Sequence, residues 1–143
     1  MPALKFLVKN MYPTVSFILP VQKNTDFLTE QVNAVFKFSE RYPGFCELII
    51  VSDVLENGIF QLVWLTVKLN KIGHPHVRTR IIRYASHVEP EELVKMGIKN
   101  ALGQKIVIAA NAPVISDDFD GFGKKDIVIA KFLFDENVFK NLA

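Results

Sequence analysis

The clearest pattern along the chain is a short apolar run that stops at polar residues. Positions 48–51 are all apolar, and Ser52 and Asp53 follow at once. This pattern is typical of a parallel strand that is buried on both faces and ends at the polar rim of a sheet. Residues 56–58 then predict a helix start, with Asn57 as the cap. Ligands of open α/β sheets bind beyond the carboxyl ends of the strands, so we expect this turn to face any site.

Strands and helices are predicted to alternate along most of the chain. Further strands are expected at 15–19 (ended by Pro20), 77–84, 105–109 and 126–132. Helices are expected from Asp26, from Gly58 and from Pro90, the last one ending at Gly103, with short helices at 3–12 and 135–142. Strand-helix-strand units of this kind are parallel and right-handed. We therefore predict one domain over 1–143, with a short amino-terminal helix at 3–12 and a core at 14–132. The expected fold is a three-layer α/β sandwich with a mostly parallel sheet.

Two predicted elements have unusual patterns. The strand at 77–84 alternates arginines with apolar residues, which predicts the edge of the sheet. The helix after Gly58 is apolar on nearly every side, and such a helix must be covered all round. One hypothesis is that Trp64 and its neighbours pack against a second subunit. Burial under the amino-terminal segment is an equal alternative.

Composition and charge narrow the class of protein. The chain has 143 residues, half of them apolar, and a formal net charge of +2. Scattered charges of this balance disfavour DNA or RNA as a partner. The only cysteine, Cys46, lies in a predicted strand, which favours a small buried hydrophobe over a reactive thiol. No apolar run is long enough to span a bilayer, and the amino terminus lacks a signal-peptide pattern, so we expect a cytoplasmic protein.

The histidines give little evidence for a metal. His74 and His76 lie on a predicted turn without a nearby acid or cysteine in the sequence, and solvated turn histidines are the favoured interpretation. His87 lies in the loop after the third strand, nearer to where a ligand is expected.

The order of motifs resembles the amino-terminal half of family 2 glycosyltransferases with the Rossmann-like GT-A fold, especially dolichyl-phosphate mannose synthase-like proteins. In that family the first strand runs into Pro-Val-Tyr-Asn-Glu, and here VSFILP runs into VQKN. The second strand ends in Asp-Asp-Gly-Ser-x-Asp-Gly, and here the same register gives SDVLENG. Gly97, Ala101, Gly103 and KIVIA match a later helix and strand, and DIVIAKF resembles a further strand. The resemblance covers roughly residues 14–132.

The resemblance implies a nucleotide site, but most of its functional positions differ. The positions that it assigns to nucleotide binding are Pro20, Gln22, Lys23, Asn24, Ser52, Asp53 and Asn111. Lys23 adds a positive charge that could meet a phosphate without metal. Asn111 on its own reads as a turn residue before Pro113.

The family's metal motif, Asp-x-Asp, falls on Ala110, Asn111 and Ala112. Hard cations need oxygen ligands, and alanine offers none, so we expect no metal and no cofactor. Without a metal, the charge on a diphosphate leaving group has little to stabilise it. The acidic stretch 117–121 resembles a calcium loop only loosely and favours a solvated loop. In the family the acceptor-binding half follows the fifth strand, so by this resemblance we expect that half to be absent here.

Together these features predict a truncated glycosyltransferase-like pseudoenzyme with a binding or regulatory role. The expected ligand is a nucleotide or nucleotide sugar. An active, atypical glycosyltransferase completed by a partner subunit is one alternative, and an assembly module with an empty crevice is another, because fold alone does not convey function.

Overall fold

The computed structural model describes residues 12–22, 28–110, 123 and 126–130. Several predicted features lie outside these ranges: the helices at 3–12 and 135–142, the helix start at Asp26, the site residues Lys23, Asn24 and Asn111, the acidic stretch 117–121, and the end of the fifth strand.

The described strands form one parallel sheet in the order β3-β2-β1-β4-β5. Their bounds are β1 (Val15–Val21), β2 (Cys46–Ser52), β3 (Val77–Arg83), β4 (Lys105–Ile108) and β5 (Asp126–Ile129). The sheet is thus parallel throughout its described part, as expected for alternating strands and helices. The chain reverses its direction of winding at β1, with β2 and β3 on one side and β4 and β5 on the other. Ligand crevices of open α/β sheets lie at such a reversal.

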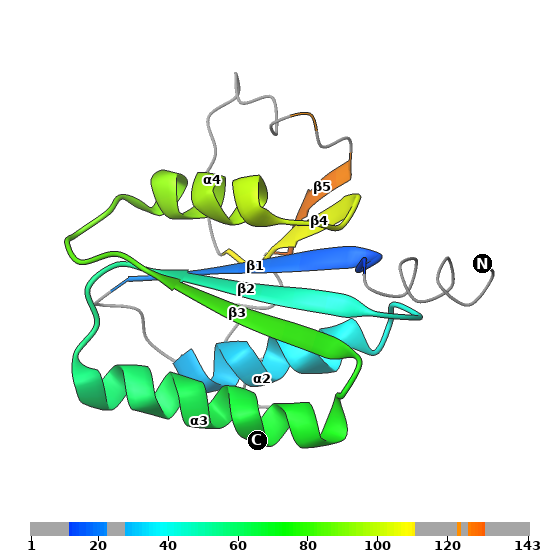
Figure 1. Ribbon diagram of the computed structural model, residues 1–143, viewed down its shortest axis with the longest axis horizontal. Coiled ribbons are helices and arrows are strands. Elements are labelled where there is room, and N and C mark those ends of the chain that lie inside the picture. Colours follow the sequence, from blue (N-terminus) through cyan, green and yellow to red (C-terminus); the bar gives the residue numbers. More distant parts are fainter. Residues whose placement is uncertain (1–11, 23–27, 111–122, 124–125, 131–143) are drawn as a thin grey trace, which may run out of the picture.

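Helices cover both faces of the sheet, which confirms the three layers. The helices are α2 (Leu28–Ser39), α3 (Asn57–Gly73) and α4 (Pro90–Asn100). Figure 1 shows α2 and α3 on one face and α4 on the other. A right-handed crossover requires this arrangement, because α4 leads from β3 back across the sheet to β4.

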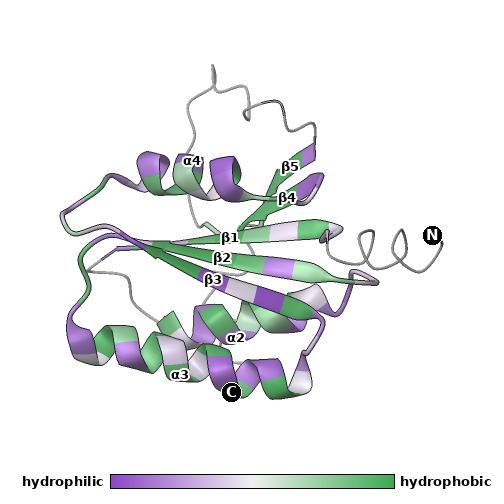
Figure 2. Ribbon diagram, in the orientation of Figure 1, coloured by the Kyte–Doolittle hydropathy of each residue, from purple (hydrophilic) through white to green (hydrophobic). Residues whose placement is uncertain are grey.

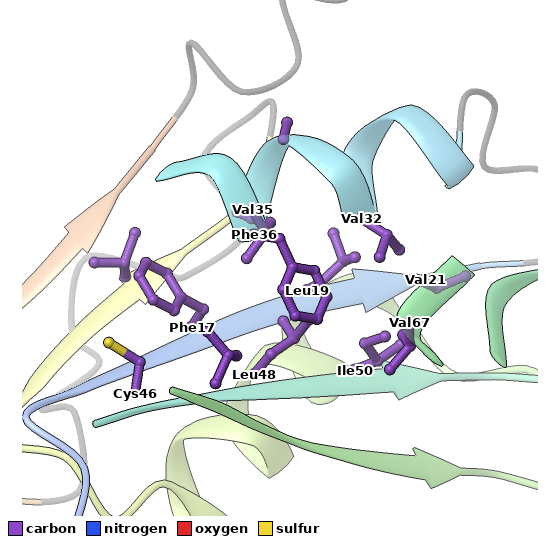
Figure 3. Packing of buried hydrophobic residues seen from close by; sticks show 14 of the residues in the cluster. Phe17, Leu19, Val21, Val32, Val35, Phe36, Cys46, Leu48, Ile50 and Val67 are labelled. Carbon is purple, nitrogen blue, oxygen red and sulfur yellow. The ribbon is translucent and has the colours of Figure 1, made fainter. Parts of the chain in front are cut away.

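The central strand β2 is buried along its whole length. Leu48 and Ile50 belong to the apolar cluster under α2 and α3, whereas Ile49 and Val51 belong to the cluster under α4. Figure 3 shows side chains of the first cluster, including the rings of Phe17 and Phe36, packed between α2 and the sheet. Two covered faces leave no polar side in the strand, which explains the continuous apolar run.

Cys46 is fully buried in this strand, as predicted. Burial raises the pKa of its thiol, so the sulfur behaves as a small hydrophobe.

The first strand runs one residue further than expected. Pro20 was predicted to end it, but β1 continues through Val21 and pairs with β2 to Ser52. Successive residues of β1 face β2 and β4 in turn: Val21 accepts from Asp53 N, and Ile18 accepts from Ala109 N. Pro20 therefore faces the side of β4, which has already ended at Ile108. A proline without an N–H costs no ladder bond there.

Two predicted helix boundaries are wrong. The residue before α3 is Glu56, and neither it nor Asn57 caps with a side chain, because Asn57 is already the first helical residue. The helix α4 begins at Pro90 as predicted but ends at Asn100, before Gly103. Gly103 serves a close approach instead: a Cβ at this position would lie 2.9 Å from the backbone nitrogen of Ser16.

A buried carboxylate ties the amino end of the sheet to the segment after α4. Glu47 is 1% exposed. It accepts hydrogen bonds from Ser16 Oγ at 2.6 Å, from Leu102 N at 2.7 Å and from Arg80 Nη2 at 2.9 Å. Ser16 Oγ in turn accepts from Gly103 N at 2.8 Å. These bonds satisfy groups that would be costly to bury unpaired.

The strand β3 forms one edge of the described sheet, as its arginines predicted. Each arginine is held by a neighbour. Arg78 lies 5.1 Å from the ring centre of Phe45, and Arg83 lies 3.8 Å from that of Phe60, while Arg80 pairs with Glu47.

Within the part of the chain that the structure describes, the helix α3 is buried along one side. Val63, Thr66 and Val67 are buried. Large apolar side chains are exposed on the rest of its surface: Leu62 51%, Trp64 42%, Leu65 53%, Leu69 60% and Ile72 80%. Figure 2 shows hydrophobic residues recurring along α3 as well as in the central strands. None of the described helices is long and apolar enough to cross a membrane.

Candidate functional site

The carboxyl ends of the strands bring together polar residues from three separate stretches of the chain. Gln22 follows β1, Ser52 and Asp53 end β2, and the loop from Tyr84 to Glu89 follows β3. Parallel pairing places these ends at one edge, because Val21 is level with Ser52 and Ser52 is level with Arg83. The sequence predicted this gathering from the order of the strands.

The central feature of this edge is a pair of Asp53 and His87. Asp53 Oδ2 lies 2.9 Å from His87 Nδ1, and the carboxylate side chain is 1% exposed, whereas the imidazole is 68% exposed. A carboxylate only accepts, so Nδ1 carries the proton in this bond. The backbone N–H of Asp53 also donates to Val21 O at 3.1 Å, which fixes the residue on the sheet.

Two acids act on His87 from opposite sides. Its Nε2 lies 3.2 Å from Glu89 Oε1, on the residue just before α4. The hydrogen bond to Asp53 raises the pKa of His87 above its ordinary value, and Glu89 adds to this effect. The imidazole is therefore protonated over a wider pH range than a free histidine.

The other predicted residues at this edge have mixed environments. Gln22 Nε2 donates to Val88 O at 3.0 Å. Ser52 is fully buried, and its Oγ has no hydrogen-bond partner among the described residues. Pro20 is half-buried within β1. The structure thus brings together Pro20, Gln22, Ser52 and Asp53.

The position of the family's metal motif can be tested at its first residue. Ala110 is 4% exposed, and its backbone N–H donates to Ile108 O at 3.1 Å. A buried methyl group offers no oxygen to a divalent cation, so Ala110 does not fit the role of a ligand. Within the described ranges no group of histidine, cysteine or acidic side chains could hold a metal ion.

The sequence pointed to His87 as lying near the ligand position but did not predict its partner. Asp53 and His87 are 34 positions apart. The usable signal was topological: the two residues follow strands that are consecutive in sequence, and consecutive strands usually lie side by side in a sheet.

The other two histidines differ from the predicted solvated pair. His74 Nε2 lies 2.8 Å from Glu40 Oε1, and its side chain is 17% exposed. His76 Nε2 lies 3.3 Å from Ser39 Oγ. Both side chains thus join the turn before β3 to the end of α2. The sequence did not reveal the nearby acid, because Glu40 is 34 positions from His74.

No family model and no curated protein matches the sequence. Solved glycosyltransferase structures do match the fold. S. aureus TarS has a TM-score of 0.52 and 17% identity over 67% of this chain and 16% of that chain. A structure of TarS 1–349 gives the same values over 26% of that chain. The mannosyltransferase PcManGT from Pyrobaculum calidifontis, in complex with GDP-Man and Mn²⁺, has a TM-score of 0.50 and 15% identity over 66% of this chain and 26% of that chain.

These comparisons define the class of fold. The protein has a glycosyltransferase-like α/β fold of the GT-A, nucleotide-diphospho-sugar transferase type. The matched part of this chain spans only 16% to 26% of the length of these three structures. At these identities the likeness concerns the fold and not the chemistry.

Proposed function

We propose that the protein is a degenerate glycosyltransferase-like protein that binds a nucleotide or nucleotide sugar without a divalent metal. Its role would be binding or regulation. The observation that carries this proposal is the buried carboxylate of Asp53 at the carboxyl edge, beside the point where the sheet reverses. A buried charge is costly unless it is paired, and it is retained most readily where it meets a specific partner.

The chemistry of this edge suits the base of a nucleotide better than a metal ion. Asp53 accepts N–H donors, and uracil and guanine both present a ring N–H. Ala110, which follows β4 on the other side of β1, offers no ligand to a cation. For the phosphates we propose Lys23, which lies outside the described residues and is the second residue after the end of β1. The predicted contact at Asn111 remains part of this proposal.

Calorimetric titration tests the nucleotide site. Purified protein would be titrated with UDP, GDP and their sugar conjugates, with and without manganese. We expect binding that does not depend on manganese and that weakens at least about tenfold in Asp53→Asn, because a carboxylate acceptor is lost. The exposed acid Glu92 supplies the matched control, Glu92→Gln, which should bind like the parent. No binding by the parent under any of these conditions would overturn the proposal.

Two further readouts refine this test. Lys23→Ala should weaken binding of the diphosphates, and unchanged affinity would exclude a phosphate contact at this residue. Transfer of sugar from a labelled nucleotide sugar would instead favour the alternative of an atypical transferase. The expected cytoplasmic location and the extent of the single domain stay predictions.

We also propose that α3 packs against a second copy of the chain. Leu62, Leu65, Leu69 and Ile72, here called the leucine stripe, are all at least half exposed. Their spacing of three, four and three residues is that of a coiled-coil seam. The stripe covers about 15 Å of helix at the usual rise per residue. Trp64 lies beside it, with Lys68 Nζ 5.3 Å from its ring centre.

Light scattering during size-exclusion chromatography tests this interface. We expect a dimer at micromolar concentration that dissociates in the double variant Leu65→Gln, Leu69→Gln. Lys71→Gln is the matched control, since Lys71 is exposed on the same helix and lies outside the stripe. A monomeric parent, or a double variant as dimeric as the control, would exclude the interface.

A further inference from the structure

The loop between β3 and α4, residues 84–89, crosses the carboxyl ends of two neighbouring strands. Tyr84 N donates to Ser52 O at 2.9 Å, which continues the pairing of β3 with β2. His87 Nδ1 then donates to Asp53 Oδ2 at 2.9 Å. Val88 O accepts from Gln22 Nε2 at 3.0 Å, beyond the end of β1. The loop is therefore fixed to the ends of both β2 and β1.

The loop uses the side chains that a ligand would need. Gln22 and Asp53 are both predicted nucleotide contacts, and each of them holds the β3–α4 loop in this structure. The exposures of the pair are very unequal, with Asp53 at 1% and His87 at 68%. A ligand that is to reach Asp53 Oδ2 must take the place of the imidazole. The imidazole can leave at little cost in packing, because most of its surface already faces water.

We propose that the β3–α4 loop is a latch on the nucleotide site, and that a ligand with an N–H donor displaces His87 from Asp53 when it binds. This inference rests on the nucleotide site proposed above and concerns its regulation. The ligand would replace one N–H donor by another, so the buried carboxylate stays paired in both states. The displaced loop would also carry Val88 away from Gln22 and break the hydrogen bond between them.

Such a latch responds to pH. Asp53 and Glu89 are the described charged groups that act on His87, and both raise its pKa. Protonated His87 holds the carboxylate more strongly than neutral His87 does. The latch is therefore firmest at low pH and loosens as the pH rises through the raised pKa of His87. Displacement of His87 lowers its pKa, so binding should release a proton and become tighter as the pH rises.

Titration with GDP-mannose and UDP-glucose at pH 5.5, 6.5 and 8.0 tests the latch. The phosphates of these sugar nucleotides keep the same charge over this range, so that a change in affinity reports on the protein. We expect His87→Ala to bind about two- to fivefold more tightly than the parent at pH 5.5, the range that a partly exposed ion pair supports. At pH 8.0 the two proteins should differ less.

The matched control is His76→Ala. His76 lies before β3, at the opposite end of the strand, and contacts Ser39. Its removal should leave both the affinity and the pH dependence of the parent unchanged. A loss of pH dependence in both variants would mean that the effect is not local to the site, and it would overturn the latch.

The remaining outcomes separate the latch from the site itself. Equal affinity of the parent and His87→Ala at every pH would refute the latch and leave the site standing. Weaker binding by His87→Ala at pH 5.5 would show that His87 binds the ligand, which also refutes the latch. Absence of binding by both proteins would refute the site, and the latch with it.

Nuclear magnetic resonance gives a second measure of the latch. The imidazole C–H signals of His87 report its pKa directly, and saturating nucleotide sugar should lower that pKa toward the ordinary value. A bound protein in which the pKa of His87 is unchanged would contradict displacement.

Discussion

Substitution of the buried Glu47 by glutamine tests how strongly the amino end of the sheet depends on one carboxylate. The side chain is 1% exposed and accepts from Ser16 Oγ, Leu102 N and Arg80 Nη2. Glutamine has nearly the same shape, so that packing is preserved. Its amide nitrogen is a donor, however. Every partner of the Glu47 carboxylate is also a donor, so this nitrogen would face a donor in place of an acceptor.

The expected cost follows from the partners that lose an acceptor. A buried donor that loses its acceptor costs about 1–3 kcal/mol. The Arg80 side chain is 37% exposed, so water can replace part of its bond and its share must be discounted. We expect Glu47→Gln to lower the free energy of unfolding by about 2–4 kcal/mol. With a urea dependence of about 2 kcal/mol per M, the unfolding midpoint would fall by about 1–2 M.

Urea unfolding followed by circular dichroism measures this change. Glu92→Gln is the matched control, because this acid has a side-chain exposure of 63% and should shift the free energy by less than about 0.5 kcal/mol. The slope of the transition should be the same for parent and variants. If Glu47→Gln unfolded at the midpoint of the control, the charged hydrogen bonds to Glu47 would not stabilise the fold.

Two further predictions concern close packing and protonation. A Cβ on Gly97 would lie 2.5 Å from Ile18 Cγ2, so Gly97→Ala should lower the free energy of unfolding in urea by about 1–3 kcal/mol. Gly58→Ala is the control and should cost nothing, because no atom lies within 4 Å of the new Cβ. Equal unfolding midpoints of the two variants would contradict the tight contact of α4 with β1. Asp53→Asn should lower the pKa of His87 toward its ordinary value, as followed by imidazole resonances. Because the pKa of His87 is raised in the folded state, the pair of Asp53 and His87 stabilises the fold fully below the ordinary pKa of histidine. This stabilisation is lost as the pH rises through the raised pKa. The difference in free energy of unfolding between the parent and Asp53→Asn should therefore shrink with rising pH.

Much of the fold could be predicted from the sequence because its strands are parallel and covered on both sides. The run at 48–51 is apolar without interruption, since alternate residues enter two different cores. The arginines of β3 likewise marked the sheet edge. Boundaries were less accurate. The end of β1 at Val21 depends on how far the neighbouring strand extends, and the first residue of a helix such as Asn57 is not fixed by the periodic pattern.

The contacts of the candidate site were harder to predict because they join distant positions. The sequence placed Asp53 at the carboxyl edge but gave no sign that it would be buried under His87. The hydrogen bond between His74 and Glu40 could not be predicted for the same reason, because the two residues are 34 positions apart. Side-chain pairs of this kind depend on the exact register and on loop geometry, and neither has a periodic signature in the sequence.

The arginines of β3 also constrain how the sheet can grow. An open edge of a sheet is a template for a strand from another chain, and fixed charges discourage such pairing. Here Arg78 and Arg83 lie over the rings of Phe45 and Phe60, and Arg80 is bound to Glu47, so that none of the three can easily turn aside. We therefore expect these fixed cations to disfavour fibril-like addition of a foreign strand along β3, at the edge of the described sheet.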